Sequence, residues 1–290
     1  MTVYPDYYPH FRCIASACKH NCCIGWEIDI DDDTLTLYRQ LNTPLGDRLR
    51  AHIDPRPAPH FVLGAGERCP FLNEQNLCDI IARMGEEALC DICYLHPRFH
   101  NERGDYTEVG LGLSCEAAAA LILGQKEPVV LRRDDGSVPP GAGERDRLIS
   151  ALQDRSRPLA QRLPFLTLQE TKEWIDLFLS LERLDEQWTQ RLTAAKTVTE
   201  EQLERLDEQM KERQTEYEQL SVYLLYRHYS NDPRSKKLPR LICSLLRLLA
   251  ASILTEKGDF TFADQVELAR AFSAEIEYSD VNMDILLSNL

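Results

Sequence analysis

Long hydrophobic runs are missing from this sequence of 290 residues. The most apolar stretch, residues 238–254, is interrupted by Pro239, Arg240 and Arg247. It therefore falls short of the roughly 20 consecutive apolar residues that a membrane-spanning helix needs. The first residues also lack the basic and apolar segments of a secretory signal. We expect a soluble, cytoplasmic protein that does not bind membranes.

Positive charge is scarce relative to negative charge. The chain has 33 lysine and arginine residues against 47 aspartate and glutamate residues, which gives a formal net charge of -14. Binding to nucleic acid depends on a broad basic surface that displaces counterions from the phosphates, so the composition excludes nucleic acid as the main partner. An acidic surface instead favours a basic partner.

Cysteine is concentrated in the first part of the chain. Nine of the 10 cysteines precede residue 116, and the last, Cys243, lies alone in an apolar segment. In a reducing cytosol, clustered cysteines bind metals or carry redox chemistry more often than they form disulfides. Free cysteine is also a common small buried residue, and we assign that role to Cys243. The residues that we predict as metal ligands are Cys18, Cys22, Cys23, Cys69, Cys78, Cys90, Cys93 and Cys115.

The spacing of these cysteines indicates a metal centre without identifying the metal. Cys90 and Cys93 are separated by two residues, which lets one turn of chain present two thiolates to a single ion. Other cysteines of the two clusters complete a set of four sulfur ligands. Such a set suits zinc and an iron–sulfur cluster equally well.

The pattern of apolar residues predicts a mainly α-helical fold. A cysteine-rich metal-binding region with short strands and irregular loops around a metal centre is expected in residues 1–127, a hairpin and linker in 128–144, and a helical domain in 145–290. The alternation in Trp26–Ile30 predicts a strand, and Asp135-Gly136 predicts the hairpin turn.

Helices are predicted from apolar residues at three- and four-residue steps. A capping box, Thr199 followed by Gln202, predicts the start of one of them, and its charged faces also allow a short coiled coil. The predicted helices follow Asp31-Asp32-Asp33 and occupy 116–123, 174–184, 199–224, 237–255 and 261–278.

Short motifs along most of the chain form a recognisable set. The N-terminal motifs are Cys22-Cys23-x-Gly25-Trp26, Cys69-Pro70-Phe71-Leu72, Leu77-Cys78, Cys90-x2-Cys93, His96-Pro97-Arg98-Phe99 and Leu113-Ser114-Cys115. The C-terminal motifs are Tyr223-Leu224-Leu225-Tyr226-Arg227-His228-Tyr229 and Ala274-Glu275-Ile276-Glu277-Tyr278-Ser279-Asp280-x-Asn282. Together they resemble the flagellin lysine N-methylase family, whose N-terminal part belongs with cysteine-rich zinc- or iron-chelating domains.

The resemblance implies an enzyme of the bacterial flagellum. It implies transfer of methyl groups from S-adenosylmethionine to lysine side chains of flagellin, with a 4Fe-4S cluster held by the cysteines. Arg98, in the loop after Cys93, and Trp26, beside the Cys22-Cys23 pair, are the residues that we assign to cofactor binding.

The sequence departs from the usual signatures of S-adenosylmethionine binding. Gly64-Ala65-Gly66 and Gly141-Ala142-Gly143 are the nearest approach to a glycine-rich cofactor loop, but neither follows a convincing strand and opens a helix. The three-cysteine motif of radical enzymes is also absent, because Gly25 stands where its third cysteine is required.

Methylation of lysine by direct displacement requires a neutral amine. Free lysine has a pKa near about 10.4, so a base or a desolvating pocket must remove its proton. The catalytic candidates are Tyr226, Glu275, Glu277 and Tyr278, although each is by default a structural or surface residue. Glu275 and Glu277 are two residues apart and face different sides of a helix, so they are not expected to act as a pair.

Two other functions also fit the residues. One is a non-catalytic protein in which structural zinc holds the N-terminal half and the helices bind a protein partner. The other is an iron–sulfur protein that transfers electrons or senses redox state.

Overall fold

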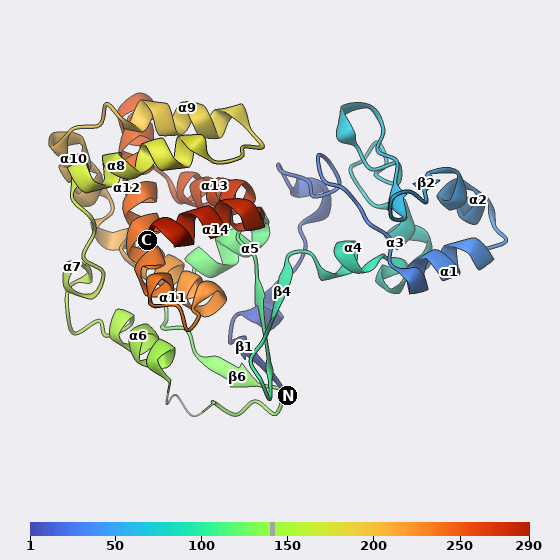
Figure 1. The fold of residues 1–290 in the computed structure, drawn as a ribbon, viewed down its shortest axis with the longest axis horizontal. Coiled ribbons are helices and arrows are strands. Elements are labelled where there is room, and N and C mark those ends of the chain that lie inside the picture. Colours follow the sequence, from blue (N-terminus) through green and yellow to red (C-terminus); the bar gives the residue numbers. More distant parts are fainter. Residues whose placement is uncertain (140–142) are drawn as a thin grey trace. The chain divides into compact units, whose positions relative to one another are not determined.

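The structure, a computed structural model, describes residues 1–139 and 143–290, and the chain divides into two compact units (Figure 1). We call Arg12–Phe99 the cysteine unit, and Met1–Phe11 together with His100–Leu290 the helical unit. These bounds differ from the predicted division at 127 and 144, because the first strand pairs with strands beyond residue 100. Within the predicted linker, 140–142, including Gly141-Ala142, lie outside the described residues.

The cysteine unit is built from short elements. Asp31 caps its first helix by accepting a hydrogen bond from the Thr34 amide at 2.8 Å, as the aspartate run predicts. Two very short strands pair antiparallel, Ile53 with Phe61 and Asp54 with His60. The elements are α1 (Asp32–Gln40), α2 (Pro44–Ala51), β2 (Ile53–Asp54), β3 (His60–Phe61), α3 (Asp79–Met84) and α4 (Asp91–Leu95).

The predicted strand at Trp26–Ile30 does not form. Ile28 and Ile30 are buried, as the alternation requires, but the backbone of this segment makes only an isolated bridge between Asp29 and His60. A strand needs a continuous ladder of backbone hydrogen bonds. Here the Ile30 amide donates to the Pro59 carbonyl and the Phe61 amide to the Ile28 carbonyl, but the ladder does not continue.

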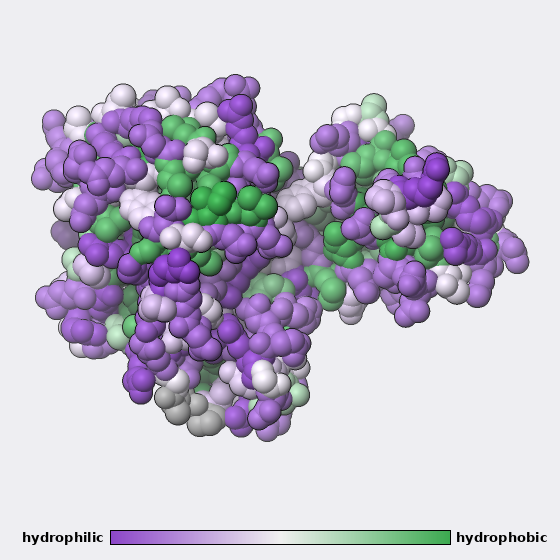
Figure 2. All heavy atoms as spheres, in the orientation of Figure 1, coloured by the Kyte–Doolittle hydropathy of each residue, from purple (hydrophilic) through white to green (hydrophobic). Residues whose placement is uncertain are grey.

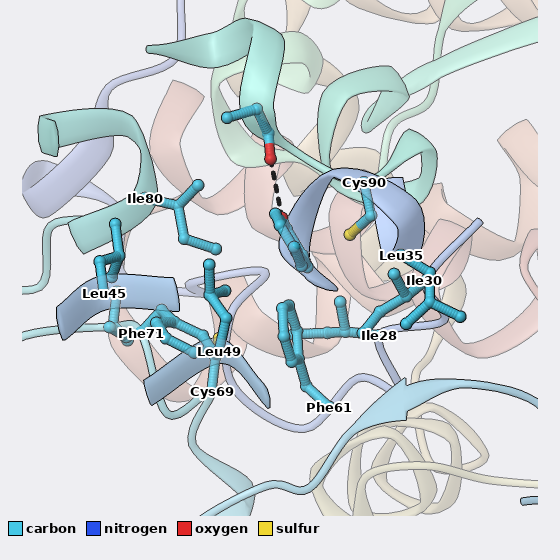
Figure 3. Close-up of a cluster of buried hydrophobic side chains, with 13 residues drawn as sticks. Ile28, Ile30, Leu35, Leu45, Leu49, Phe61, Cys69, Phe71, Ile80 and Cys90 are labelled. Atoms are coloured by element: carbon cyan, nitrogen blue, oxygen red, sulfur yellow. Dashed lines mark hydrogen bonds between the residues drawn. The ribbon is translucent and has the colours of Figure 1, made fainter. Parts of the chain in front are cut away.

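Aromatic rings organise the core of the cysteine unit. Phe61 and Phe71 lie with ring centroids 4.9 Å apart, and the buried Tyr38 hydroxyl donates a hydrogen bond to the Ala88 carbonyl at 2.7 Å. Figure 3 shows Cys69 and Cys90 among these apolar side chains. The cysteine region therefore has a hydrophobic core of its own and does not depend on a metal for all of its burial.

The helical unit contains a small mixed sheet. Its strand order is β4 (Arg98–Glu102), β5 (Thr107–Leu111), β1 (Thr2–Pro5), β6 (Leu131–Arg133). Val3 is paired with Glu108 on the parallel side and with Arg133 on the antiparallel side. The predicted turn forms, with Gly136 at a φ of 78°, but β6 pairs with β1 and not with a second arm of a hairpin.

Helices make up the rest of this unit and most of the chain, so the predicted mainly α-helical class is confirmed. Gly124 ends α5, and Thr199 with Gln202 forms the capping box of α10, both as predicted. The helices are α5 (Glu116–Leu123), α6 (Glu144–Leu152), α7 (Leu159–Arg162), α8 (Leu168–Ser180), α9 (Glu186–Ala195), α10 (Glu200–Gln209), α11 (Thr215–His228), α12 (Leu238–Lys257), α13 (Phe262–Phe272) and α14 (Asp280–Asn289).

Two predicted helices are interrupted. The chain predicted as one helix at 199–224 breaks between α10 and α11 around a short 3-10 turn at Lys211–Arg213, which rules out a continuous coiled coil there. The chain predicted as one helix at 261–278 passes from α13 into a π-helical segment, Ser273–Glu277, before α14 begins. A π-helical turn holds an extra residue, and it redirects the side chains that follow.

The central helix of this unit is α12, which contacts α8, α9, α10, α11 and α13. Residues Pro233–Lys257 are long and apolar enough to cross a membrane by length and composition, but 72% of the apolar window is buried inside the structure. The burial identifies the segment as a core helix.

Buried carboxylates in the helical unit are paired with arginines. Glu108 is fully buried and accepts hydrogen bonds from Arg103 and Arg145, at 2.9 and 2.5 Å. Glu218 on α11 is likewise buried between Arg155 and Arg162, at 2.9 and 2.5 Å. Arg145, Arg155 and Arg162 lie 37, 63 and 56 residues from their carboxylate partners. A buried charge is tolerated only with such a partner.

Most of the visible surface is hydrophilic, with apolar side chains gathered over the region of α14 (Figure 2). Exposed apolar residues of this segment include Tyr278, Val281 and Ile285.

Replacing Glu218 with alanine is expected to destabilise the helical unit. The change leaves the 7% exposed Arg162 side chain buried without its charge partner, and breaking such a pair costs about 3 kcal/mol or more. Urea unfolding followed by tryptophan fluorescence measures the free energy of unfolding. Lys196→Ala is the control, because it removes an exposed pair with Asp176, which is worth less than about 1 kcal/mol. Equal costs in the two variants would contradict the prediction.

Candidate functional site

Two sites in the chain combine burial, charge and chemically reactive side chains, one in each unit. The first is the group of cysteines in the cysteine unit. Backbone pairing brings its members together: Ile24 bridges Arg68, and the Cys69 amide donates to the Cys23 carbonyl at 2.8 Å. A second bridge between Leu72 and Cys78 folds the chain after Cys69 back on itself.

Cys90 and Cys93 lie on a single turn, as their spacing predicts. Cys90 is the residue before α4, and the Cys93 amide donates to its carbonyl at 3.0 Å. The two Sγ atoms are 3.5 Å apart. Two thiolates at this separation are close enough to share one metal ion, given metal–sulfur bonds of about 2.3 Å.

The electrostatics of the thiols link this turn to the other cysteines. A hydrogen bond with Cys90 raises the pKa of Cys93 well above its ordinary range, and burial adds to the rise. Negative charge on Cys23 and Cys69 raises it further. Burial and neighbouring thiolates together raise the pKa of Cys69 to about 11. The thiols therefore oppose one another's ionisation.

The pKa of Cys23 is raised by the same kinds of interaction as that of Cys93. A hydrogen bond with Cys22 raises the pKa of Cys23 above its ordinary range, followed by burial and by charge on Cys69 and Cys78. The same hydrogen bond lowers the pKa of Cys22 to about 7. A cation relieves such repulsion, because metal binding stabilises the thiolate form of every ligand. We call the group the six-thiol cluster; it comprises Cys22, Cys23, Cys69, Cys78, Cys90 and Cys93.

The remaining two predicted ligands are Cys18 and Cys115. Cys18 donates a hydrogen bond from Sγ to the His20 carbonyl at 3.3 Å, and Cys115 precedes α5 in the helical unit. Across residues 1–139 and 143–290, no group of three or more His, Cys, Asp or Glu side chains is arranged to hold a metal ion. The predicted metal centre is thus not confirmed, although six of its eight residues are brought together.

The residues predicted to bind a cofactor lie in the cysteine unit near one loop. The Trp26 ring faces the His96 ring, with centroids 6.3 Å apart, and Arg98 donates to the Tyr94 carbonyl at 3.2 Å. Burial, together with the charge of Arg98, lowers the pKa of His96 to about 4. A neutral histidine and a cation therefore lie two residues apart in this loop.

The second site surrounds Glu277 at the end of the π-helical segment in the helical unit. Its side chain is fully buried, and the Tyr223 hydroxyl donates to its two oxygens at 3.1 and 3.0 Å. His228 Nε2 lies 2.5 Å from Oε1, and Arg227 Nη1 lies 3.8 Å from Oε2. The spacing of Tyr223, Arg227 and His228 places all three on one side of the last turns of α11.

The charges around Glu277 keep it ionised. Burial by itself would raise its pKa, but the charge of Arg227 and the hydrogen bond from His228 outweigh burial and lower the pKa of Glu277 to about 2. Tyr278 completes the group at the surface, with its ring 5.1 Å from the Arg227 guanidinium carbon. We call Tyr223, Arg227, His228, Glu277 and Tyr278 the Glu277 cluster.

The structure brings only two of the four predicted catalytic residues into the Glu277 cluster, namely Glu277 and Tyr278. The Tyr226 hydroxyl instead donates to the carbonyls of Val3 and Val109, which fastens α11 to the sheet. The Glu275 carboxylate accepts hydrogen bonds from the amides of Leu184 and Asp185, at 2.8 and 2.7 Å. Glu275 and Glu277 therefore contact different partners.

Sequence reasoning missed His228, Arg227 and Tyr223 as site residues. The spacing of Tyr223 and Arg227 is a usable signal, since residues four apart on a helix are neighbours. The partner that makes them a site, Glu277, is 49 residues beyond His228, and nothing local indicates that contact.

Together, the fold and the two sites define a mainly α-helical protein with an attached cysteine-rich unit. The sequence profile of the FliB lysine N-methylase C-terminal domain matches residues 165–290. Flagellar biosynthetic protein FliU of Salmonella muenchen is 30% identical over 138 residues, which are 44% of this chain and 79% of FliU. No solved structure matches the chain.

Two further relatives are named lysine-N-methylase. The protein of Salmonella choleraesuis is 29% identical over 134 residues, and that of Salmonella typhimurium is 28% identical over 134 residues. Each match covers 44% of this chain, and the chain spans about a third of the length of either relative. The chain belongs to the flagellin lysine N-methylase family.

The stability of the protein is expected to fall in acid because of Glu277. Its folded-state pKa of about 2 lies below its ordinary value of 4.5. The ionised group therefore contributes about 3 kcal/mol to the free energy of unfolding above pH 4.5, and this contribution is lost as the pH falls toward 2. Urea unfolding at a series of pH values should show a smaller loss across this window for Glu277→Gln than for the natural protein.

Glu173→Gln, on an exposed part of α8, serves as the control and should follow the natural protein. The same pH dependence in Glu277→Gln and in the natural protein would show that Glu277 is not the responsible group.

Proposed function

We propose that this protein methylates lysine side chains of flagellin, with S-adenosylmethionine as the methyl donor. Membership of the family carries the proposal, since two relatives are named lysine-N-methylase and a third is named a flagellar biosynthetic protein. The matched residues 165–290 include the whole Glu277 cluster. The reaction places the protein in the cytoplasm, where flagellin is made.

The chemistry of the Glu277 cluster supports a role on the lysine side of the reaction. A lysine amine attacks a methyl group only when it is neutral, so the site must accept a proton near neutral pH. The Glu277 cluster offers a fixed carboxylate, a histidine and the Tyr223 hydroxyl within one hydrogen-bonded group. The formal charge of -14 also favours the approach of a lysine-bearing partner.

We further propose that the six-thiol cluster binds a 4Fe-4S cluster, with zinc as the competing metal. The donor set fits either, because thiolate ligands suit both. Cys90 and Cys93 would supply two ligands from one turn, and Cys23, Cys69 and Cys78 would supply the others, since their charges already act on one another. When bound, the iron–sulfur group would supply an iron atom with an open coordination position near Trp26 and Arg98. Alternatively, it would stabilise the fold of the chain around these two residues.

Flagellin incubated with the protein and S-adenosylmethionine is expected to gain methyl groups on lysine. Mass spectrometry of proteolysed flagellin measures the gain, and omission of the donor is the control. A folded, metal-loaded protein that leaves flagellin unmodified would contradict the proposed activity.

Purification without oxygen is expected to yield roughly four iron and four sulfide per chain. Metal and sulfide analysis with an absorption spectrum provides the measurement. Cys90→Ser should lower the iron content severalfold, whereas Cys243→Ser, an equally buried cysteine in the helical unit, should leave it unchanged. A colourless protein with one zinc per chain would overturn the iron–sulfur assignment and favour the zinc alternative.

A further inference from the structure

His228 is the last residue of α11. Its imidazole lies between the buried Glu277 carboxylate and the solvent. Nε2 lies 2.5 Å from Glu277 Oε1, and the side chain keeps 14% of its surface exposed, whereas that of Glu277 is fully buried. Nδ1 makes no hydrogen bond to any other residue that the structure describes. One ring nitrogen is therefore fixed by Glu277 and the other is available.

The hydrogen bond fixes the tautomer of the ring. Glu277 is ionised, since the Tyr223 hydroxyl donates to both its oxygens and Arg227 lies 3.8 Å away. An ionised carboxylate only accepts hydrogen bonds, so Nε2 must carry the proton. The neutral ring then presents the lone pair of Nδ1, which is the arrangement by which a carboxylate orients a histidine base.

We propose that His228 is the catalytic base that takes the proton from the substrate lysine, and that Glu277 is its positioning residue. The inference rests on the proposed methylation of lysine. The lysine ammonium gives a proton to Nδ1, and the imidazolium is stabilised by the Glu277 carboxylate. The lone pair of the neutral amine then forms the new nitrogen–carbon bond, while the sulfur–carbon bond of the sulfonium donor breaks and its electron pair stays on sulfur.

The other candidate bases are less suited to this step. Glu277 has no exposed surface, and its oxygens are occupied by Tyr223 and His228. Its low proton affinity also makes it a weak base at neutral pH. Glu275 is occupied by the amides of Leu184 and Asp185.

Some groups around His228 stabilise the charged form of its imidazole, and others destabilise it. Glu277 favours the imidazolium, and the C-terminal end of α11 favours positive charge. Arg227 opposes it, and Tyr223 and Tyr278 are the other titratable groups of the cluster.

The decisive variant is His228→Gln, tested in the methylation assay with flagellin. Glutamine can still donate a hydrogen bond to Glu277 but cannot accept a proton. We expect kcat to fall by about 100-fold or more with KM little changed, because a general base contributes roughly 10² to 10⁴ in rate. His10→Gln, the same change at an exposed histidine of the helical unit, is the matched control and should retain full activity.

Two further readouts separate proton transfer from a merely structural role. In the natural protein kcat should fall on acidification, because a protonated base cannot accept the lysine proton, and this fall should be absent in His228→Gln. Added imidazole should restore activity to His228→Ala and not to His228→Gln, where the site is filled.

The outcomes distinguish this inference from the function on which it rests. Loss of methylation in the natural protein would refute the function itself. If the natural protein methylates flagellin and the kcat of His228→Gln is within threefold of its value, His228 is not the catalytic base. The absence of an acid limb from the natural protein's pH profile would refute the same assignment while leaving the proposed function intact. If His228→Gln does not fold, the pH profile of the natural protein and the rescue of His228→Ala by imidazole still test whether His228 is the base.

Discussion

The helical unit depends on the burial of α12. This helix has 20 residues, of which 13 are buried, and most of the buried ones are leucine, isoleucine or alanine. Arg240 and Arg247 lie on one face, and the wide apolar surface on the other sides is stable in water only when other elements enclose it. The helices α8 to α11 and α13 contact it, and their inward faces consequently form the core. The sheet contributes at one end, where Tyr226 of α11 ties β1 to β5 through their carbonyls.

Enclosing α12 has a consequence for the polar residues of its neighbours. Nearly all of α11 becomes buried, including Glu216 and Glu218. Each carboxylate is paired with arginine, because an unpaired buried charge would cost several kcal/mol. Glu277 follows the same rule but has a histidine as its nearest partner. Among these carboxylates it is the one whose partner can both donate and accept a proton, which is what the proposed base requires.

Local features of the fold could be predicted from the sequence with good accuracy. Asp31 and Thr199 begin helices because their side chains accept hydrogen bonds from amides of the first turn. Cys90 and Cys93 meet because two intervening residues complete one turn. In each case the interacting groups lie within a few residues of one another, so their geometry follows from helix and turn conformations alone.

Long-range features could not be predicted in the same way. The first strand pairs with residues more than 100 positions away, which moved the division between the units from that expected at 127. Cys115 belongs to the helical unit for the same reason. The π-helical segment was hidden as well, since the apolar pattern of 261–278 fits an ordinary helix. It is this segment that sends Glu275 to the amides of Leu184 and Asp185, and Glu277 to His228.

The two sites have opposite electrostatic requirements, which gives a physical reason for their separate cores. The Glu277 cluster works only if its carboxylate stays ionised, and fixed positive charge and hydrogen bonds hold it so. The thiols raise one another's pKa values and favour ionisation only when a cation arrives. In a single cluster that held both sets of groups, the negative charge of the carboxylate would repel the thiolates. Placing them in separate units lets each be adjusted without disturbing the other.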